Sequence, residues 1–271
     1  MATAFFIVSG FCNQPCLGVL CMSSHDLIFI YSIMLKKLQH LSVLILLSWV
    51  SVLNAQKGTL SIDVSYGSSI PLGDFGEANS QNSGSGYANT GFSSHTGIKY
   101  QLNEGGFHIL LGAQAQANTF DAAAYDREIT LLDPSLDWSV KADLYSLSAF
   151  LVGFQQDFRV SEKTQVGVVA QMGLSFAEDP MMSVMEYTSA YWAVYSNNYS
   201  SAAAFNFGGN AEVQFAKGFY LTVAANYLAA NHDFTRTEAF FSTGNYETYS
   251  FSKKFNTFNI QLGLAADLYK K

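Results

Sequence analysis

The chain has 271 residues, and 14 Lys and Arg against 21 Asp and Glu give a formal net charge of −7. This acidic balance excludes the basic surface that nucleic-acid binding requires. After residue 55 the sequence contains no uninterrupted apolar run of the length that a transmembrane helix needs, about 20 residues.

Residues 34–55 have the three-part layout of a secretory signal peptide. Lys36 and Lys37 form a cationic start, an apolar run from Leu41 to Val52 follows, and Ala55 supplies a small residue for cleavage. We expect translation to start at Met34. Residues 1–33 would then be an upstream extension that was wrongly included in the protein sequence. The alternative is a long signal or an N-terminal membrane helix.

Residues 56–271 would then form a single exported domain without cysteine, since all three cysteines of the chain precede residue 34. Eight segments of this domain alternate apolar and polar residues with period two, which is typical of a strand with two different faces. In the last of them, Ile260 and Leu262 alternate with Gln261 and Gly263. The eight segments are 60–67, 95–102, 107–116, 144–158, 165–176, 205–215, 219–227 and 258–269.

The connections between these segments fall into two classes. Three are tight and polar, near 103–106, 160–164 and 216–218, whereas four are long, near 71–92, 119–140, 177–201 and 230–254. Short periplasmic turns and long external loops are typical of outer-membrane barrels. The sequence therefore predicts an all-β fold, an eight-stranded antiparallel up-and-down transmembrane β-barrel. A soluble barrel of the lipocalin kind also alternates, but it does not explain the difference in loop length.

Three stretches resemble the small outer-membrane β-barrel family of the Bacteroidetes type, similar to OmpX and to the barrel half of OmpA. They are the run from Tyr66 to Gly76, the glycine-bearing strand 167–173, and the ending Asp267-Leu268-Tyr269. The resemblance covers roughly residues 57–271 and implies an outer-membrane location. Lys270 and Lys271 depart from it, because such barrels usually end on an aromatic residue.

Polar residues on the inward faces of the predicted strands include charged side chains. An eight-stranded barrel is only wide enough to be filled by side chains, so we expect these residues to pair with one another in a closed interior. A narrow porin for small solutes is the alternative. The predicted lumen network consists of Asp63, Lys99, Gln114, Gln171, Glu212 and Asp267.

The histidines of the exported part do not form a known catalytic pattern. A small barrel deacylase of lipid A carries His and Ser two residues apart on one strand, whereas His95, His108 and His232 are followed at that spacing by Gly97, Leu110 and Phe234. We therefore expect no catalytic residue, no cofactor and no metal site. A lipid-modifying barrel enzyme remains the third candidate.

The two last long connections are rich in aromatic residues, which make strong contact surfaces. They can bind an extracellular protein or glycan, or they can form the aromatic girdle at the membrane interface. Outer-membrane lipids and lipopolysaccharide are expected partners in either case. Envelope integrity or surface interaction is therefore the expected function. The predicted contact residues are Tyr187, Tyr191, Trp192, Tyr195, Phe240, Phe241, Tyr246 and Tyr249.

Export predicts a defined N-terminus for the protein in the membrane. Mass spectrometry of membrane-extracted protein should show a chain that begins at Gln56, because signal peptidase cleaves after the small residue Ala55. Peptides from residues 1–33 in that material would contradict both the start at Met34 and the cleavage.

Overall fold

The computed structural model describes residues 58–79, 82, 84–132, 134–187, 191–196, 198–240 and 245–270. The side chains of Tyr191, Phe240, Asn245 and Lys270 are outside this description. The predicted upstream extension and signal peptide, residues 1–55, also lie outside the described residues. Within the described part, no helix has the length and apolar character needed to cross a membrane.

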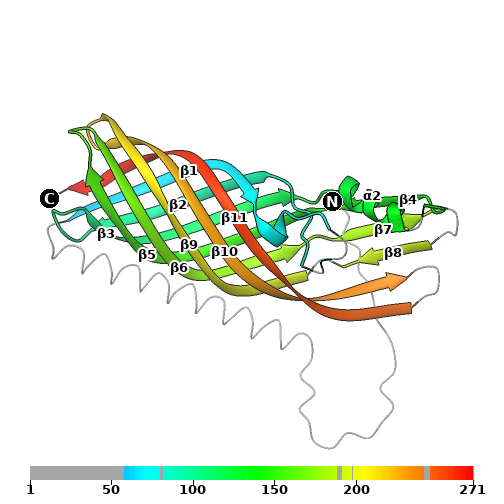
Figure 1. Cartoon of the computed structure of the whole chain (residues 1–271). Helices are drawn as coiled ribbons and strands as arrows, with labels where there is room; N and C mark the ends of the chain where they lie inside the picture. Colours follow the sequence, from blue (N-terminus) through cyan, green and yellow to red (C-terminus); the bar gives the residue numbers. More distant parts are fainter. Residues whose placement is uncertain are drawn as a thin grey trace, which may run out of the picture. The chain divides into compact units, whose positions relative to one another are not determined.

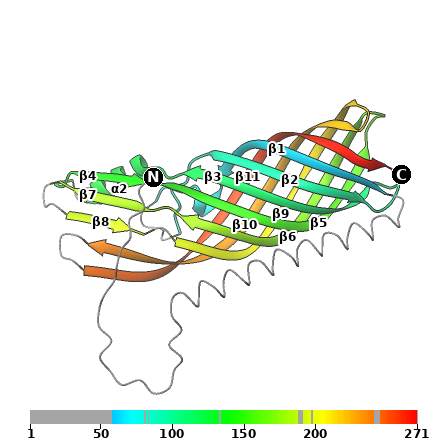
Figure 2. The same ribbon diagram turned by 180° about the vertical axis from the view of Figure 1, so that it is seen from behind.

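Eight antiparallel strands form a closed ring, which confirms the predicted fold class (Figures 1 and 2). Each strand pairs with the next along the chain, and the ring closes where the first strand pairs with the last, from Thr59 opposite Lys270 to Pro71 opposite Thr257. The strands are β1 (Thr59–Pro71), β2 (Gly91–Gln101), β3 (Phe107–Thr119), β5 (Leu144–Arg159), β6 (Thr164–Asp179), β9 (Asn198–Ala216), β10 (Phe219–Phe240) and β11 (Asn245–Lys270).

The alternation predicted from the sequence separates an apolar exterior from the interior. On β11, Ile260, Leu262 and Leu264 point outward and are 46–62% exposed, whereas Asn259 and Gln261 point inward and are almost fully buried. The outward apolar residues of β11 run from position 258 to 268, roughly 34 Å along the strand. A strand tilt near 45° converts this length to the height of about 25 Å that is typical of the lipid-facing band of such barrels.

The three tight turns lie at one end of the barrel, which we call the turn end. The start of β1 and the end of β11 lie at the same end. They join β2 to β3, β5 to β6 and β9 to β10 at the predicted positions. Gly106 and Gly218 have φ angles of 80° and 75°. These values favour glycine, because a Cβ atom is strained in the left-handed region.

The long connections at the other end, the loop end, contain more regular structure than the sequence predicted. Residues 73–75 form a short 3-10 helix, η1 (Gly73–Phe75), within the first connection. The second holds α2 (Ala122–Leu132) and β4 (Trp138–Ala142), and the third holds β7 (Met182–Glu186) and β8 (Tyr191–Tyr195). The sequence predicted 119–140 and 177–201 as long connections and assigned no helix or strand within them.

The fourth connection is also mostly strand, because β10 and β11 continue to Phe240 and from Asn245. Beyond the lipid-facing band their outer faces turn polar, with Thr235 opposite Ser250 and Thr237 opposite Thr248. The sequence suggested such a protruding hairpin as one possibility for this connection, and the structure shows it. The extended strands join a sheet of order β11–β10–β8–β7–β4, which we call the projecting sheet (Figure 1).

The interior has two layers. The half near the turn end is polar, and the half near the loop end is an apolar core. Phe75 from η1 is fully buried in this core, with its ring centroid 5.1 Å from that of Tyr145 and 4.6 Å from that of Phe255. The core residues are Phe75, Ala88, Tyr145, Leu147, Ala149, Leu151, Ala177, Ala204, Leu228, Ala230, Phe234 and Phe255.

Candidate functional site

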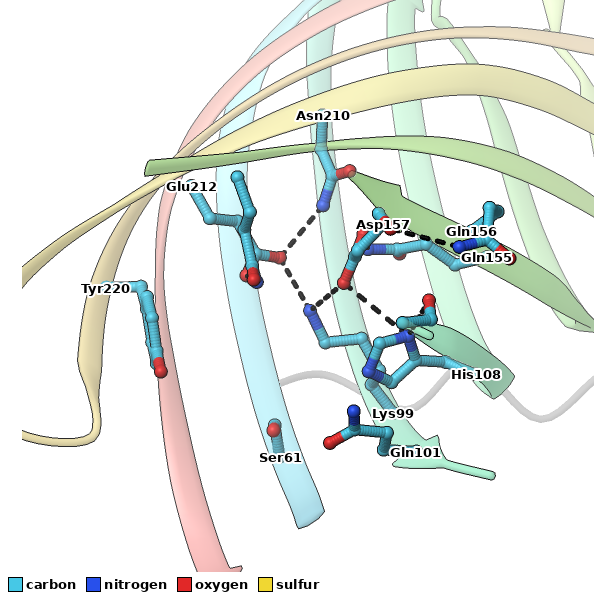
Figure 3. Close-up of polar contacts among 12 residues, drawn as sticks. Ser61, Lys99, Gln101, His108, Gln155, Gln156, Asp157, Asn210, Glu212 and Tyr220 are labelled. Atoms are coloured by element: carbon cyan, nitrogen blue, oxygen red, sulfur yellow. Dashed lines mark hydrogen bonds and ion pairs between the residues drawn. The ribbon is translucent and has the colours of Figure 1, made fainter. Parts of the chain in front are cut away.

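Lys99 lies at the centre of the polar half of the interior (Figure 3). The inward face of β2 carries it between the inward faces of β9 and β5, and its side chain is 7% exposed. The Nζ atom donates to Glu212 Oε1 at 2.8 Å and lies 3.6 Å from Asp157 Oδ2. Three strands that are distant in the sequence thus meet through one ammonium group.

Amide side chains donate further hydrogen bonds to the two carboxylates. Glu212 accepts hydrogen bonds from Gln165 at 2.6 Å and from Asn210 at 2.9 Å. Asp157 accepts one from Gln155 at 2.5 Å. Buried carboxylates need such donors, because the attraction to one ammonium group does not by itself offset their loss of water.

His108 and Gly167 belong to the strand wall around this network. His108 Nδ1 donates to the carbonyl of Gly106 at 2.9 Å and lies 3.5 Å from Asp157 Oδ2. A Cβ atom at Gly167 would collide with Asn210 and Asp157. Glycine at this position leaves room for the polar side chains around Lys99.

The other residues of the predicted lumen network lie in separate contacts. Asp63 pairs with His95, whose Nδ1 is 2.9 Å from Asp63 Oδ2. Asp267 accepts hydrogen bonds from Ser61 at 2.8 Å and Tyr220 at 3.2 Å.

Two predicted amides, Gln171 and Gln114, lie farther from the turn end of the barrel. Gln171 accepts a hydrogen bond from Asn206 at 2.8 Å. Gln114 is 3% exposed and lies apart from the group around Lys99. Only Lys99 and Glu212 of the six predicted residues therefore contact each other directly.

Sequence reasoning placed Asp157 in the lumen beside Lys99 and Glu212, but it did not include His108 and His95 in the lumen set. Both histidines lie on the inward side of the strand alternation, so parity could have added them. Their pairing could not be derived, because it depends on which strands are neighbours and in which register.

Two cavities meet at Lys99 and Glu212. The larger has a volume of about 330 Å³, lies at the turn end, and is lined by charged groups that include Glu104, Arg159 and Asp267. The smaller has about 50 Å³ and extends from Lys99 toward Asp63 and the middle of the barrel. The ion network therefore forms the boundary between a polar chamber and a small inner pocket.

Between the small pocket and the loop end, side chains fill the barrel. Thr257 donates to Gln116 at 3.1 Å, and Asn259 donates to Thr257 at 3.2 Å; Thr257 and Asn259 are fully buried. The apolar core around Phe75 lies beyond this amide layer. The first connection is held there by Tyr145, whose hydroxyl donates to the carbonyl of Gly86 at 2.6 Å.

A second ion cluster lies at the loop end, and sequence reasoning missed it. Asp179 is fully buried between Lys253, whose Nζ is 2.9 Å from Asp179 Oδ1, and Arg236. Lys253 also donates to the hydroxyl of Tyr145 at 2.8 Å. Both cations belong to the connection 230–254, which the sequence suggested could be a protruding hairpin but for which it assigned no inward or outward face.

Ser175 and His232 are near each other without forming an accessible catalytic pair. Ser175 Oγ is 3.0 Å from His232 Nε2, which is a spacing suited to a nucleophile and a base. Both residues are fully buried, and His232 packs against the core residues Phe234 and Phe255. A substrate therefore has no path to the serine in this arrangement.

The predicted aromatic contact residues lie on two faces of the projecting sheet. Trp192 and Tyr246 belong to the outer face, and they are 43% and 75% exposed. Tyr249 and Tyr195 belong to the inner face, where Arg236 lies 5.5 Å from the centre of the Tyr195 ring.

The remaining predicted contact residues are less fully defined. Tyr187 follows β7 and is 60% exposed. The side chains of Tyr191 and Phe240, and all of Phe241, are outside the described residues.

Replacing Lys99 by Met should lower the free energy of unfolding by roughly 3–5 kcal/mol, because it leaves two buried carboxylates without their ammonium partner. Urea titration of the barrel refolded in lipid vesicles measures this loss. Lys217→Met, at an exposed turn position, is the matched control and should change stability little. Equal effects of the two variants would show that the interior around Lys99 is open to water.

Comparisons of the sequence with known proteins do not assign the chain to a family. No family model matches the chain, and no curated protein matches it. Among solved structures, the chain is similar to a major outer membrane protein of Thermus thermophilus, with 10% identity over 78% of this chain and 99% of that chain and a TM-score of 0.44.

Two further solved structures are similar at the same level. Ail, the attachment invasion locus protein of Yersinia pestis, has 12% identity over 78% of this chain and 99% of its own, with a TM-score of 0.39. Neisserial surface protein A has 11% identity over 79% and 98%, with a TM-score of 0.41. The described chain, an eight-stranded ring that is apolar outside and polar in half of its interior, has the architecture of the small outer-membrane β-barrels.

Proposed function

We propose that this protein is a non-enzymatic outer-membrane barrel that holds a binding surface outside the cell. The observation that carries the proposal is the projecting sheet, which continues two barrel strands beyond the lipid-facing band. In this proposal the signal peptide of residues 34–55 exports the chain, and the barrel serves as a closed anchor. The residues of the projecting sheet then make contact with an extended segment of a partner protein.

The height of the projection follows from the change in polarity along β10. Its outward residues are apolar up to Ala229 and become polar at Asn231 and Asp233. This change marks the loop-side border of the lipid-facing band. Residues 231–240 therefore extend roughly 30 Å past the border at the rise of a strand. In this proposal the sheet reaches beyond the membrane headgroups, since even a strand tilted by about 45° would rise roughly 20 Å over this length.

β11 offers an open edge along this projection. Leu72 N donates to Asn256 O at 2.8 Å, so the main chain of Asn256 faces the β1 side. Alternate residues face the same way in an antiparallel pair. Tyr246, Thr248 and Ser250 therefore direct their N–H and C=O groups away from β10, and β1 ends at Pro71 below them. Among the described residues no strand pairs with this part of the edge.

An extended peptide is the ligand that such an edge suits, because main-chain hydrogen bonds add it to a sheet as a further strand. The outer face next to the edge carries small polar side chains together with Tyr246. The Tyr246 ring can pack against the side chains of the bound strand. Lys254 at the base of the edge already pairs with Asp74 at 3.1 Å.

Ser250→Pro tests the edge without disturbing the ladder between β10 and β11. Proline removes an N–H group that faces away from β10, and edge strands tolerate it. We expect adhesion of expressing cells to immobilised matrix protein, or to one another, to weaken by roughly tenfold for the loss of one hydrogen bond and the added clash.

Ser250→Ala is the matched control, because it removes the same hydroxyl and keeps the N–H. Heat-dependent gel migration should show that both variants fold. Equal adhesion of the two variants would contradict the role of the edge.

A closed anchor should not conduct ions steadily. The amide layer and the apolar core fill the barrel between the inner pocket and the loop end, so planar-bilayer recordings of refolded protein should show little or no stable conductance. Large and reproducible open steps would favour the narrow porin instead.

A further inference from the structure

The tip of the projecting sheet carries two like charges on neighbouring strands. Glu247 on β11 lies directly opposite Glu238 on β10. Both belong to the inner face of the sheet, because they share the strand parity of the buried residues Phe234 and Phe255. Like charges that are directly opposite across a strand pair destabilise it. Glu247 is exposed and lies on the edge strand, so a strand added to β11 places a side chain next to it.

No basic side chain close to this tip balances the two carboxylates. The sequence contains no Lys or Arg in residues 237–252. Arg236 precedes that stretch, but it pairs with the buried Asp179. At the base of the edge, Lys254 pairs with Asp74 at 3.1 Å. Among the described residues no ion pair involves either carboxylate, so the tip of the edge is negatively charged.

The hydrogen-bonding pattern of the edge brings a bound side chain close to Glu247. Tyr246 and Thr248 direct their main-chain groups away from β10, so a bound strand makes its hydrogen bonds to these two residues. Glu247 then belongs to a non-hydrogen-bonded pair, in which opposite Cα atoms of an antiparallel ladder are only about 4.5 Å apart. Tyr249 is the next residue on the same face and is 39% exposed. A cation opposite Glu247 therefore has a carboxylate beside it and an aromatic ring within diagonal reach.

We propose that the β11 edge selects an extended segment with Lys or Arg at the position that faces Glu247. This inference rests on the proposed function, because it names the chemical class of the strand that the edge binds. A basic residue there offsets the repulsion between Glu238 and Glu247, whereas an acidic residue adds a third carboxylate to the row. On the outer face, the pairs of Ala239 with Tyr246 and of Thr237 with Thr248 carry no charge, so the positions next to them do not select by charge.

Binding of designed peptides to the whole barrel tests this selection. The peptides are blocked heptapeptides of alternating threonine and valine, with lysine, glutamine or glutamate at the central position. Surface plasmon resonance at low salt measures their affinity for the refolded barrel in nanodiscs. The lysine peptide should bind roughly fivefold more tightly than the glutamine peptide, and the glutamate peptide should bind most weakly. Added salt should reduce these differences, because the charges are exposed.

Glu247→Lys identifies the residue responsible. It should reverse the order, so that the glutamate peptide binds more tightly than the lysine peptide. Glu162→Lys is the matched control, because it makes the same change in net charge at an exposed position of the turn that joins β5 to β6. It should keep the order of the wild type. An unchanged order in Glu247→Lys, or a reversed order in both variants, would overturn the proposal.

Ser250→Pro separates the failure of this inference from the failure of the proposed function. If the wild type binds all three peptides equally and Ser250→Pro weakens all of them, the edge binds strands without selecting charge, and only the role of Glu247 is refuted. If no peptide binds, or if Ser250→Pro leaves every affinity unchanged, the edge does not bind strands. Both proposals then fail together.

Discussion

The structure depends on the pairing of β1 with β11. A strand in lipid has no water to satisfy its backbone N–H and C=O groups, so each must find a partner within the protein. Pairing Thr59–Pro71 with the last strand closes the ring and leaves no edge within the lipid-facing band. Closure then separates two environments, and every residue of the eight strands must suit one of them according to its parity.

The interior meets this demand in two physically different ways. Near the turn end, Lys99 and its carboxylates exchange their water for one another and for the amides of β9 and β5. Near the loop end, apolar side chains and Phe75 exclude water, and Asp179 is buried between two cations. Phe75 and Ala88, which belong to the first connection, join the strand residues of this core.

Much of the ring could be predicted from the sequence, since period-two alternation is a local property. It placed Lys99 and Glu212 on inward faces. It was ambiguous on β5, because Leu147, Ala149 and Leu151 face the interior while Phe150 and Val152 face lipid, so both faces are apolar. Phe75 lies in a connection, where parity gives no information. The contacts of Arg236 and Lys253 with Asp179 depend on packing between segments more than fifty residues apart.

The β10–β11 hairpin is one continuous ribbon, paired from Phe219 opposite Ala266 to Phe240 opposite Asn245. A load applied at its tip and directed away from the cell acts along the strands. The ladder is then loaded in shear, and its hydrogen bonds resist together, whereas a load across the ribbon would open them one after another. Below the tip, β11 is held by β1 and β10 is held by β9 as well. Tension on the projecting sheet is thus spread around the barrel wall.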